Sequence, residues 1–374
     1  MNISNRVIKI LLVTRPIAPP WDEASKNFAY NLATNMPDFE FGLLTNGILE
    51  NLPQNIKQHP IYTSNENNFI QKLKLIINLR KIAKSYDLVH CLFTPTKLNS
   101  FLLSNLLSNK KTIQTIATLR EDLYSDEKIK KLMFGNLLAT YSDYSKNRLI
   151  TLGLKNAERI YPGIDLNYFS PAPKDLELLK KYEMRADDFV VTYPGEYTRL
   201  EAINDITDMI FRYLNIFKEN NIKFILACRL KNNADILKKE EIMERMKSCG
   251  AADAVIFINT FSEMPKLYNL SDAIIFPVRE MHGKFDVPLA VIEPMACEKP
   301  VIVSDLPILA EFAKPEHSVI IEKGNVTQLK DAILDLRRNP ERCIFIGKNG
   351  RKFIGENFDI KKAAQNYREI YNGL

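Results

Sequence analysis

The sequence predicts an α/β protein made of two doubly wound halves, each a parallel sheet with helices on both faces. Short β-branched runs alternate with longer amphipathic stretches, a pattern that is typical of βαβ units. The alternation stops between residues 158 and 175, where three prolines and a glycine lie close together, and then starts again. A chain of 374 residues is also expected to form more than one core.

The first half opens with the run IKILLVT, whose apolar part is too short for a signal-peptide core and is interpreted as a strand. Similar runs follow, separated by segments with helical periodicity. Expected strands are 8–14, 39–45, 88–93, 111–117 and 137–141, and expected helices are 22–35, 67–85, 97–108, 126–134 and 143–152.

The second half repeats the alternation. Because parallel sheets bind ligands at the carboxyl ends of their strands, contacts are expected from the loops that follow strands in both halves. Expected strands are 189–195, 222–229, 254–259, 273–278, 300–305 and 318–322, and expected helices are 202–217, 233–248, 263–270, 293–298, 306–313, 326–338, 340–355 and 359–372.

Composition narrows the class of protein. Hydrophobic residues make up 46% and charged residues 26%, as in a soluble globular protein, and no apolar run approaches the roughly 20 residues that cross a bilayer. The five cysteines form no C-x-x-C pair and the four histidines form no ligand-spaced cluster, so we expect neither a metal site nor disulfides, and a cytoplasmic location. No dense basic face with interleaved aromatics indicates nucleic-acid binding.

One carboxylate stands out within the apolar stretch FDVPLAVIEPMACEKPVIVSD, which begins at residue 285. Proline costs about 3 kcal/mol inside a helix, so Pro294 is expected in a first helical turn, with Glu293 at the helix N-terminal end. The free N–H groups and partial positive charge of such an end suit a phosphate, and the carboxylate suits sugar hydroxyls. The alternative is that Glu293 only satisfies its own helix end.

Four segments in this order resemble a known family. IEPMACEKPVIVSDLPILAEF is similar to the second half of an E-x7-E motif and the segment that follows it in the retaining GT-B glycosyltransferases of glycosyltransferase family four. The resemblance implies two Rossmann-like domains facing across a cleft: an acceptor-side domain over 1–170 and a donor domain over 171–355, with a C-terminal helix at 356–374 packing back on the first domain. The four segments are 8–33, 141–171, 261–278 and 292–312.

On the donor side, the resemblance implies a nucleotide-sugar site in which Glu293 binds the ribose. The first glutamate of the motif falls on Phe285, so Glu280 or Asp286 is expected to take its place. The family arginine and lysine that hold the diphosphate are replaced by Glu196 and Glu201, which leaves other cations for that role. The expected donor-binding residues are Gly195, Arg199, Arg229, Lys231, His282, Gly283, Lys284, Phe285, Val287 and Glu293.

On the acceptor side, the segment 115–122 lacks the family histidine near the sugar, and its available polar groups are Arg120, Glu121 and Asp122. The expected catalytic residues are Arg120 and Asp122 from this segment and Glu280 and Asp286 from the donor loop. Trp21 either stacks on an acceptor sugar or is a packed loop aromatic. Asp22 is placed on the acceptor side as well, although capping of the following helix is the alternative for it and for Glu23. His90 is expected to be a satisfied, partly buried side chain.

The resemblance therefore implies transfer of a hexose-type sugar, with retention and without a metal or cofactor, from a UDP- or GDP-linked donor to a glycan, lipid-linked or small-molecule hydroxyl. Because the family arginine and lysine are replaced by Glu196 and Glu201, the alternative is a non-catalytic GT-B protein that binds a nucleotide, a glycan or a partner. The basic amphipathic segment 69–86 either lies on an anionic membrane, which would place the protein at its inner face, or packs as an ordinary surface helix.

Overall fold

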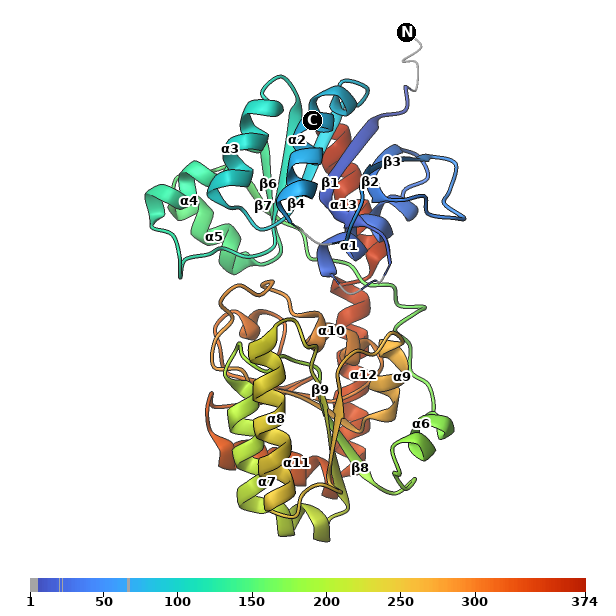
Figure 1. Ribbon diagram of the computed structural model, residues 1–374, viewed down its shortest axis with the longest axis vertical. Coiled ribbons are helices and arrows are strands. Elements are labelled where there is room, and N and C mark those ends of the chain that lie inside the picture. The colour runs from blue at the N-terminus through green and yellow to red at the C-terminus, as the bar shows by residue number, and fades with distance from the viewer. Residues whose placement is uncertain (1–5, 20, 22, 66–67) are drawn as a thin grey trace. The chain divides into compact units, whose positions relative to one another are not determined.

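The computed structural model describes residues 6–19, 21, 23–65 and 68–374. The chain divides into two compact units, each with its own sheet (Figure 1). The first unit comprises Met1–Asp165, Gly283–Asp286 and Phe358–Leu374, and the second comprises Leu166–His282 and Val287–Asn357. The predicted class of two doubly wound parallel-sheet halves is confirmed, and the main division falls after residue 165 rather than after 170.

The first unit contains a parallel sheet in the order β3-β2-β1-β4-β5-β6-β7. The strand order reverses between β1 and β4, which makes the carboxyl ends of these two strands the topological switch point where such sheets bind ligands. Its strands are β1 (Lys9–Ile17), β2 (Glu40–Asn46), β3 (Ile56–Tyr62), β4 (Leu88–Leu92), β5 (Lys111–Ile116), β6 (Leu137–Thr140) and β7 (Ala157–Arg159).

Three helices of the first unit begin where a polar side chain satisfies a free backbone N–H group. Asn68, Thr96 and Ser142 each accept a hydrogen bond from the N–H three residues on, and thereby cap α2, α3 and α5. The helices are α1 (Ala24–Thr34), α2 (Phe69–Ala83), α3 (Lys97–Leu106), α4 (Asp126–Leu132), α5 (Asp143–Thr151) and, from the end of the chain, α13 (Ile360–Gly373).

Helix α13 is built into the core of the first unit. Its Tyr367 and Tyr371 are buried, and Tyr371 packs edge-to-face on Phe41. The chain just before the second unit passes very close to this helix, because a Cβ at Gly163 would lie 2.4 Å from the Cα of Ile360. Only glycine permits this approach, so Gly163 fixes where α13 docks.

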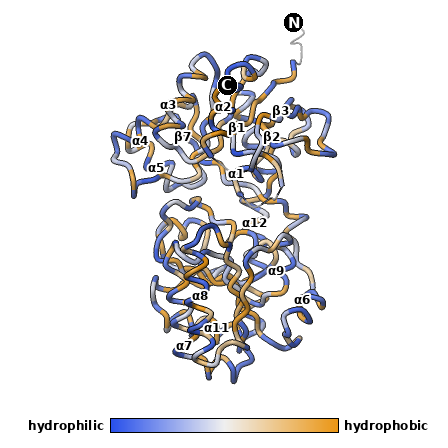
Figure 2. The backbone as a smooth tube through the Cα atoms, viewed as in Figure 1, coloured by the Kyte–Doolittle hydropathy of each residue, from blue (hydrophilic) through white to orange (hydrophobic). Residues whose placement is uncertain are grey.

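The second unit contains a parallel sheet in the order β10-β9-β8-β11-β12-β13, whose order reverses between β8 and β11. Hydrophobic, orange stretches of both units concentrate in the inner strands, whereas the outer helices alternate in colour (Figure 2). The elements are α6 (Leu176–Lys181), β8 (Phe189–Tyr193), α7 (Ala202–Glu219), β9 (Ile222–Ala227), α8 (Asn233–Ser248), β10 (Val255–Ile258), α9 (Met264–Leu270), β11 (Ala273–Phe276), α10 (Leu289–Ala296), β12 (Val301–Ser304), the 3₁₀ turn η1 (Leu309–Glu311), β13 (Val319–Ile321), α11 (Val326–Arg338) and α12 (Pro340–Asn357).

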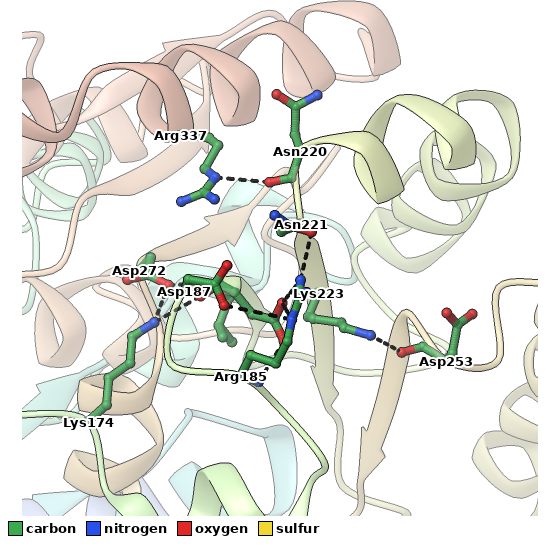
Figure 3. Close-up of polar contacts among 11 residues, drawn as sticks. Lys174, Arg185, Asp187, Asn220, Asn221, Lys223, Asp253, Asp272 and Arg337 are labelled. Atoms are coloured by element: carbon green, nitrogen blue, oxygen red, sulfur yellow. Dashed lines mark hydrogen bonds and ion pairs between the residues drawn. The ribbon is translucent and has the colours of Figure 1, made fainter.

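The amino ends of the central strands in the second unit are closed by polar contacts (Figure 3). Lys174 Nζ lies 2.6 Å from Asp272 Oδ2, and the same oxygen accepts the backbone N–H of Val190 at 2.7 Å. At the next strand, Arg185 donates to Asn221 at 2.6 Å. These groups satisfy one another at the amino ends, and a ligand site is expected at the opposite edge of the sheet, at the carboxyl ends of the strands.

Some elements differ from their prediction. The short edge strands β3 and β7 and the short helix α6 were not predicted, since their sequences carry little periodicity. The helix expected at 306–313 is reduced to the turn η1. Helix α10 begins at Leu289 instead of at residue 293, which changes the environment of Glu293.

Candidate active site

The carboxyl edge of the second unit is formed by the loops after β8, β9 and β11. Because all these strands are parallel, the loops at 194–201, 228–232 and 277–288 emerge on one edge. They carry most of the donor-binding residues proposed from the sequence. The second unit therefore places Gly195, Arg199, Arg229, Lys231 and His282 on the edge that contains its own switch point, between β8 and β11, whereas Gly283, Lys284 and Phe285 belong to the first unit.

Glu293 lies on the second turn of α10, so the placement at a helix N-terminal end is wrong, and Pro294 lies inside the helix. The helix starts earlier because Leu289 begins a run whose Val291 and Ile292 are fully buried, and this burial outweighs the hydrogen bond that proline lacks. The free N–H groups of α10 belong to its first turn. They are separate from the Glu293 carboxylate.

Glu293 is held by the neighbouring helix. The hydroxyl of Tyr268, on α9, donates a 2.8 Å hydrogen bond to Glu293 Oε2. Burial raises the pKa of Glu293 to about 8, because desolvation disfavours the charged carboxylate, and the bond from Tyr268 offsets this only in part. The side chain is thus positioned and neutral near pH 7, ready to exchange hydrogen bonds with a polar ligand. Tyr268 was not identified from the sequence.

Glu196 pairs with Arg199 and Lys231, the two cations that were expected to bind the diphosphate. Arg199 donates to both of its carboxylate oxygens, at 2.6 Å and 2.8 Å, and Lys231 Nζ lies 2.5 Å from Oε1. The Glu196 side chain is only 7% exposed, whereas the two cations are about half or one-third exposed. The loop therefore holds a buried carboxylate at the centre of its positive charge, a role that the sequence analysis did not foresee.

Gly195 is required by the packing of this loop. A Cβ at this position would lie 1.9 Å from the ring of Tyr193, which is fully buried beneath the loop. The following residues reach α7 through an unusual backbone, since Leu200 and Glu201 both have positive φ, 71° and 57°. Glu201 occupies the N-cap of α7 without a side-chain capping bond. The backbone there is strained, which fits a loop whose shape is imposed by its surroundings.

Arg279 is a further cation at this edge that the sequence analysis missed. Its guanidinium makes two hydrogen bonds, of 2.8 Å and 2.7 Å, to Asp205 in the first turn of α7. Its backbone N–H donates to the carbonyl of Leu200 at 3.1 Å. The pair ties the loop after β11 to the start of α7, and its hydrogen bonds raise the pKa of Arg279. A signal was present, since Arg279 directly follows the predicted strand 273–278.

The loop after β11 is divided between the two units. The side chains of Glu280 and His282 are in contact in the second unit, while Gly283, with φ of 70°, begins the four residues that belong to the first. Lys284 lies within this four-residue segment, and the buried Val287 returns the chain to the second unit. The candidates of this loop are thus shared between two separate environments. Arg229, after β9, is half-buried in the second unit.

Asp286 anchors the four-residue segment within the first unit. The hydroxyls of Ser142 and Ser145 both donate to its Oδ2 at 2.5 Å, and its backbone N–H donates to the carbonyl of Ala117 at 2.8 Å. The residue is 2% exposed and lies at the first turn of α5, where the helix dipole favours an anion. These contacts describe a structural anchor. They leave Glu280 as the more exposed of the two carboxylates proposed to replace the first motif glutamate.

The acceptor-side candidates Arg120 and Asp122 are paired with each other. The guanidinium makes two hydrogen bonds to the carboxylate, of 2.8 Å and 2.7 Å, and the pKa of Arg120 is raised by them. The two side chains are 27% and 17% exposed. They form one ion-paired polar group in the segment after β5.

The predictions for the loop between β1 and α1 have different outcomes. Trp21 is exposed, and its ring lies 4.7 Å from that of Tyr30. Asp22 lies outside the described residues. Glu23 is the N-cap of α1 but makes no capping bond, so its capping prediction is wrong, and its carboxylate lies 3.7 Å from Arg15 instead.

His90 lies in the interior of the first unit. It is fully buried, with hydrogen bonds of 2.7 Å to the Tyr371 hydroxyl and 2.6 Å to Thr115, and burial lowers its pKa to about 3. The prediction of a satisfied structural side chain is confirmed. Among the described residues, no group of three His, Cys, Asp or Glu side chains is arranged to hold a metal ion, and no helix is long and apolar enough to cross a membrane.

Comparison with known proteins gives a consistent relationship. Residues 177–353, which lie in the second unit apart from Gly283–Asp286, match the family described as glycosyl transferases group 1. An uncharacterized glycosyltransferase, MJ1178 of Methanocaldococcus jannaschii, is 27% identical over 92% of this chain and 93% of its own. CapM, a capsular polysaccharide biosynthesis glycosyltransferase of Staphylococcus aureus, is 24% identical over 67% of this chain and 64% of its own.

Solved structures show the same fold. HepE of Anabaena, solved with UDP-glucose, has a TM-score of 0.78 at 17% identity, with 98% of this chain and all of that chain covered. Sucrose-phosphate synthase of Thermosynechococcus elongatus gives the same score, identity and coverage. The fold is therefore GT-B, and the family match together with the relatives supports glycosyl transfer from a nucleotide sugar.

Proposed function

We propose, from the glycosyltransferase relationship that the family match and the relatives support, that this chain transfers a hexose-type sugar from a UDP- or GDP-linked donor to a hydroxyl acceptor. We further propose retention of anomeric configuration, no requirement for a metal or cofactor, and a role in polysaccharide or glycoconjugate biosynthesis. CapM, a relative of this chain, carries polysaccharide biosynthesis in its name, and HepE was solved with UDP-glucose.

The observation that carries the proposal is the placement of Glu293. It lies within the segment that matches the glycosyl transferases group 1 family, it is half-buried and held by Tyr268, and its raised pKa favours the neutral form. A neutral carboxyl group both donates and accepts hydrogen bonds, which suits the vicinal hydroxyls of a ribose. We assign the ribose of the donor to Glu293 on this basis.

The diphosphate of the donor requires positive charge, because negative charge grows on it as the bond to the sugar breaks. We propose that Arg199 and Lys231 supply this charge and exchange part of their pairing with Glu196 for the phosphate oxygens. Arg229 and backbone N–H groups of loop 283–288 complete the donor contacts. In the proposed reaction, the bond between the anomeric carbon and the diphosphate oxygen breaks, a bond from the acceptor oxygen to the anomeric carbon forms, and the proton of the acceptor hydroxyl passes to the departing diphosphate.

The first unit is proposed to bind the acceptor, with the Arg120–Asp122 pair and Trp21 as its polar and aromatic contacts. We propose a cytoplasmic location, with contact at the inner face of the membrane through α2. One face of α2 packs on its unit through Leu79 and Ala83, while the opposite face leaves apolar side chains exposed. The buried face fits the alternative of a packed surface helix, and the exposed apolar side chains are what supports the proposed membrane contact.

A non-catalytic GT-B protein remains a second candidate because of one observation, the pairing of Arg199 and Lys231 with the buried Glu196. Turnover separates the two candidates. Release of UDP or GDP from a panel of nucleotide sugars should be measured for the wild type, for Glu293→Ala and for the control Glu240→Ala on the surface of α8. Donor turnover that is lost only in Glu293→Ala supports the enzyme, and nucleotide binding without turnover of any donor supports the binding protein.

A further inference from the structure

The second unit begins with residues 166–172, which we call the entry segment. It begins with a turn, so its backbone N–H and C=O groups need partners from other parts of the unit. Two side chains supply such partners, Arg351 on α12 and Asn269 on α9. The two ends of the entry segment are therefore held by two different helices.

Arg351 joins the entry segment to the end of α10. Its guanidinium donates to the carbonyl of Phe169 at 3.1 Å and to that of Leu166 at 3.4 Å. It also donates to the carbonyl of Ala296, the last residue of α10. The last carbonyls of a helix have no partner within the helix, and the helix dipole favours a cation beside them. One planar guanidinium, with its five N–H donors, thus satisfies carbonyls of two segments.

Asn269 holds the other end of the entry segment. Its side-chain amide donates to the carbonyl of Ser170 at 2.9 Å, and its Oδ1 accepts the N–H of Ala172 at 3.0 Å. Asn269 is 4% exposed, so water does not compete for these bonds. Helix α10 packs against both α9 and α12, and the entry segment is therefore bonded to all three helices.

The entry segment also packs on the pair that carries the proposed ribose site. The half-buried ring of Phe169 lies 6.3 Å from the ring of Tyr268, a distance typical of aromatic pairs. Tyr268 is 1% exposed, and its hydroxyl donates to Glu293 at 2.8 Å. A continuous series of contacts thus runs from Arg351 through Phe169 and Tyr268 to Glu293.

Tyr168 brings the entry segment close to Glu293 by a second route. Its ring packs edge-to-face on Phe169 at a centroid distance of 5.0 Å. Burial and the charges of Glu263 and Glu293 raise the pKa of Tyr168, which shows that its hydroxyl lies near these carboxylates. The position of the entry segment therefore affects both the support and the surroundings of Glu293.

We propose that Arg351 is a positioning residue of the donor site, and that it holds the entry segment where Tyr268 and Glu293 keep the arrangement that binds the donor ribose. Arg351 acts through the entry segment and not by contact with the ligand. This inference rests on the proposed assignment of the ribose to Glu293. It adds to that site a residue of α12, which the sequence gave no reason to connect with a nucleotide.

The physical reason lies in the access of water. If the entry segment loosens, water reaches Tyr268 and Glu293, and the desolvation that raises the pKa of Glu293 becomes smaller. The carboxyl group then loses its proton at a lower pH. A charged carboxylate only accepts hydrogen bonds and repels the diphosphate of the donor, so ribose binding is weakened.

The pH dependence of binding can be assigned to Glu293. The titratable groups that face it are Tyr268 from α9, Tyr168 from the entry segment and Cys297 on α10. The pKa of Cys297 is raised to about 12 by burial, and the pKa values of both tyrosines are raised as well, so all three stay neutral from about pH 7 to 9. The charged groups that act on these three are Glu263, Lys299 and Arg351.

The test compares the full chain with Arg351→Met in calorimetric titration with UDP and GDP. Arg337→Met is the matched control, because Arg337 also donates from a helix to a backbone carbonyl, that of Asn220 at 2.9 Å, at the amino ends of the strands (Figure 3). Arg351→Met is expected to weaken the nucleotide that binds wild type by roughly tenfold at neutral pH. Arg337→Met should leave the affinity unchanged, and thermal unfolding verifies that both variants are folded.

A nucleotide without ribose hydroxyls separates positioning from a general structural role. The 2′,3′-dideoxy analogue of the same nucleoside diphosphate lacks the groups assigned to Glu293. Its affinity should therefore be the same in wild type and in Arg351→Met. Arg351→Lys, which keeps the charge but lacks the planar donors, should lie between wild type and Arg351→Met. Equal weakening of the nucleotide and its dideoxy analogue would overturn the proposal.

The pH profile of nucleotide binding gives a second readout. In wild type, the affinity should fall as the pH rises through the pKa of Glu293, about 8. The fall should begin at a lower pH in Arg351→Met, and Glu293→Gln should show no such fall. Phe169→Leu interrupts the same series of contacts and should shift the profile in the same direction, also if Arg351→Met does not fold. Wild-type profiles in both variants would refute the role of Arg351.

Failure of the donor site and failure of this inference have different signs. If neither UDP nor GDP binds the wild type, the proposed donor site is refuted, and the free energy of unfolding still reports on Arg351. The contribution of Glu293 to stability should level off near pH 8 in wild type, where the pKa of Glu293 is about 8, and at a lower pH in Arg351→Met. The same levelling pH in both proteins would refute the positioning role alone.

Discussion

The hydroxyl of Tyr268 lies 2.8 Å from Glu293 Oε2, and it joins two neighbouring helices of the second unit at the residue on which the proposed donor site depends. The bond stabilises the charged carboxylate, but burial acts more strongly in the opposite direction and raises the pKa of Glu293 to about 8. The folded protein therefore keeps a proton that the unfolded chain releases at a much lower pH. This has a measurable consequence for stability.

The free energy of unfolding should fall as the pH rises from about 5 to 8 and then level off, so far as Glu293 contributes. Between its unfolded and folded pKa values, the folded state binds the proton and the unfolded state does not, so each rise in pH favours unfolding. Glu293→Gln should remove this part of the pH dependence and raise the melting temperature at pH 9 relative to wild type. Glu240→Gln, on the surface of α8, is the control. An identical pH dependence in Glu293→Gln and wild type would contradict the shifted pKa.

Glu196→Gln should change the affinity for nucleoside diphosphates. It removes the charge that pairs with Arg199 and Lys231, so both cations become available to phosphate oxygens. We expect roughly a fivefold to tenfold tighter binding of UDP or GDP, equivalent to about 1–1.4 kcal/mol, measured by titration at fixed salt. Glu201→Gln, an exposed carboxylate in the same loop, should have a much smaller effect. Weaker binding in Glu196→Gln would show that Glu196 positions the cations instead of competing for them.

Asp286→Ala should destabilise the protein. It leaves the hydroxyls of Ser142 and Ser145 without their buried acceptor, which costs about 1–3 kcal/mol. Chemical denaturation measures the change, with Asp331→Ala, 61% exposed on α11, as the control. Glu280→Ala should instead leave stability within about 0.5 kcal/mol and lower donor turnover. A stable Asp286→Ala protein without turnover would return Asp286 to the catalytic candidates.

Gly163→Ala should be among the more harmful single-methyl additions in the chain. The added Cβ would lie 2.4 Å from the Cα of Ile360, so the start of α13 would have to move. Overpacking of this kind costs about 1–3 kcal/mol, and denaturant titration measures it. Gly373→Ala is a matched control near the other end of the same helix, because nothing lies within 4 Å of the added atom. Equal stability of the two variants would refute the close approach.

The sequence predicted the architecture well because the hydrophobic alternation is strong. The ranges 233–248 and 326–338 match α8 and α11 residue for residue, and each follows an asparagine that caps the helix. Edge strands such as β3 were missed, since a strand at the edge is only half-buried and its residues need not alternate. Local sequence patterns predicted an element correctly where its apolar periodicity and its capping residue indicated the same bounds.

Predictions from local sequence patterns were wrong where the burial of apolar side chains opposed the preference of a single residue. The preference of Pro294 for a first turn was overridden by the buried run that precedes it, and this displaced Glu293 into the helix. The pairing of Arg199 with Glu196 over three residues was visible in the sequence, but the reach of Lys231 from another loop was not. Contacts between loops depend on the folded sheet, and no local sequence pattern predicts them.

The segment Gly283–Asp286 has a practical consequence for dissecting this protein. Its four residues pack with the first unit although the chain on both sides of them belongs to the second. A fragment spanning 166–357 would carry Asp286 without Ser142 and Ser145, and a fragment ending at 165 would lack the acceptor for those two hydroxyls. Neither half can be excised by a single cut with its interior complete, so truncated fragments are poor substitutes for the intact polypeptide.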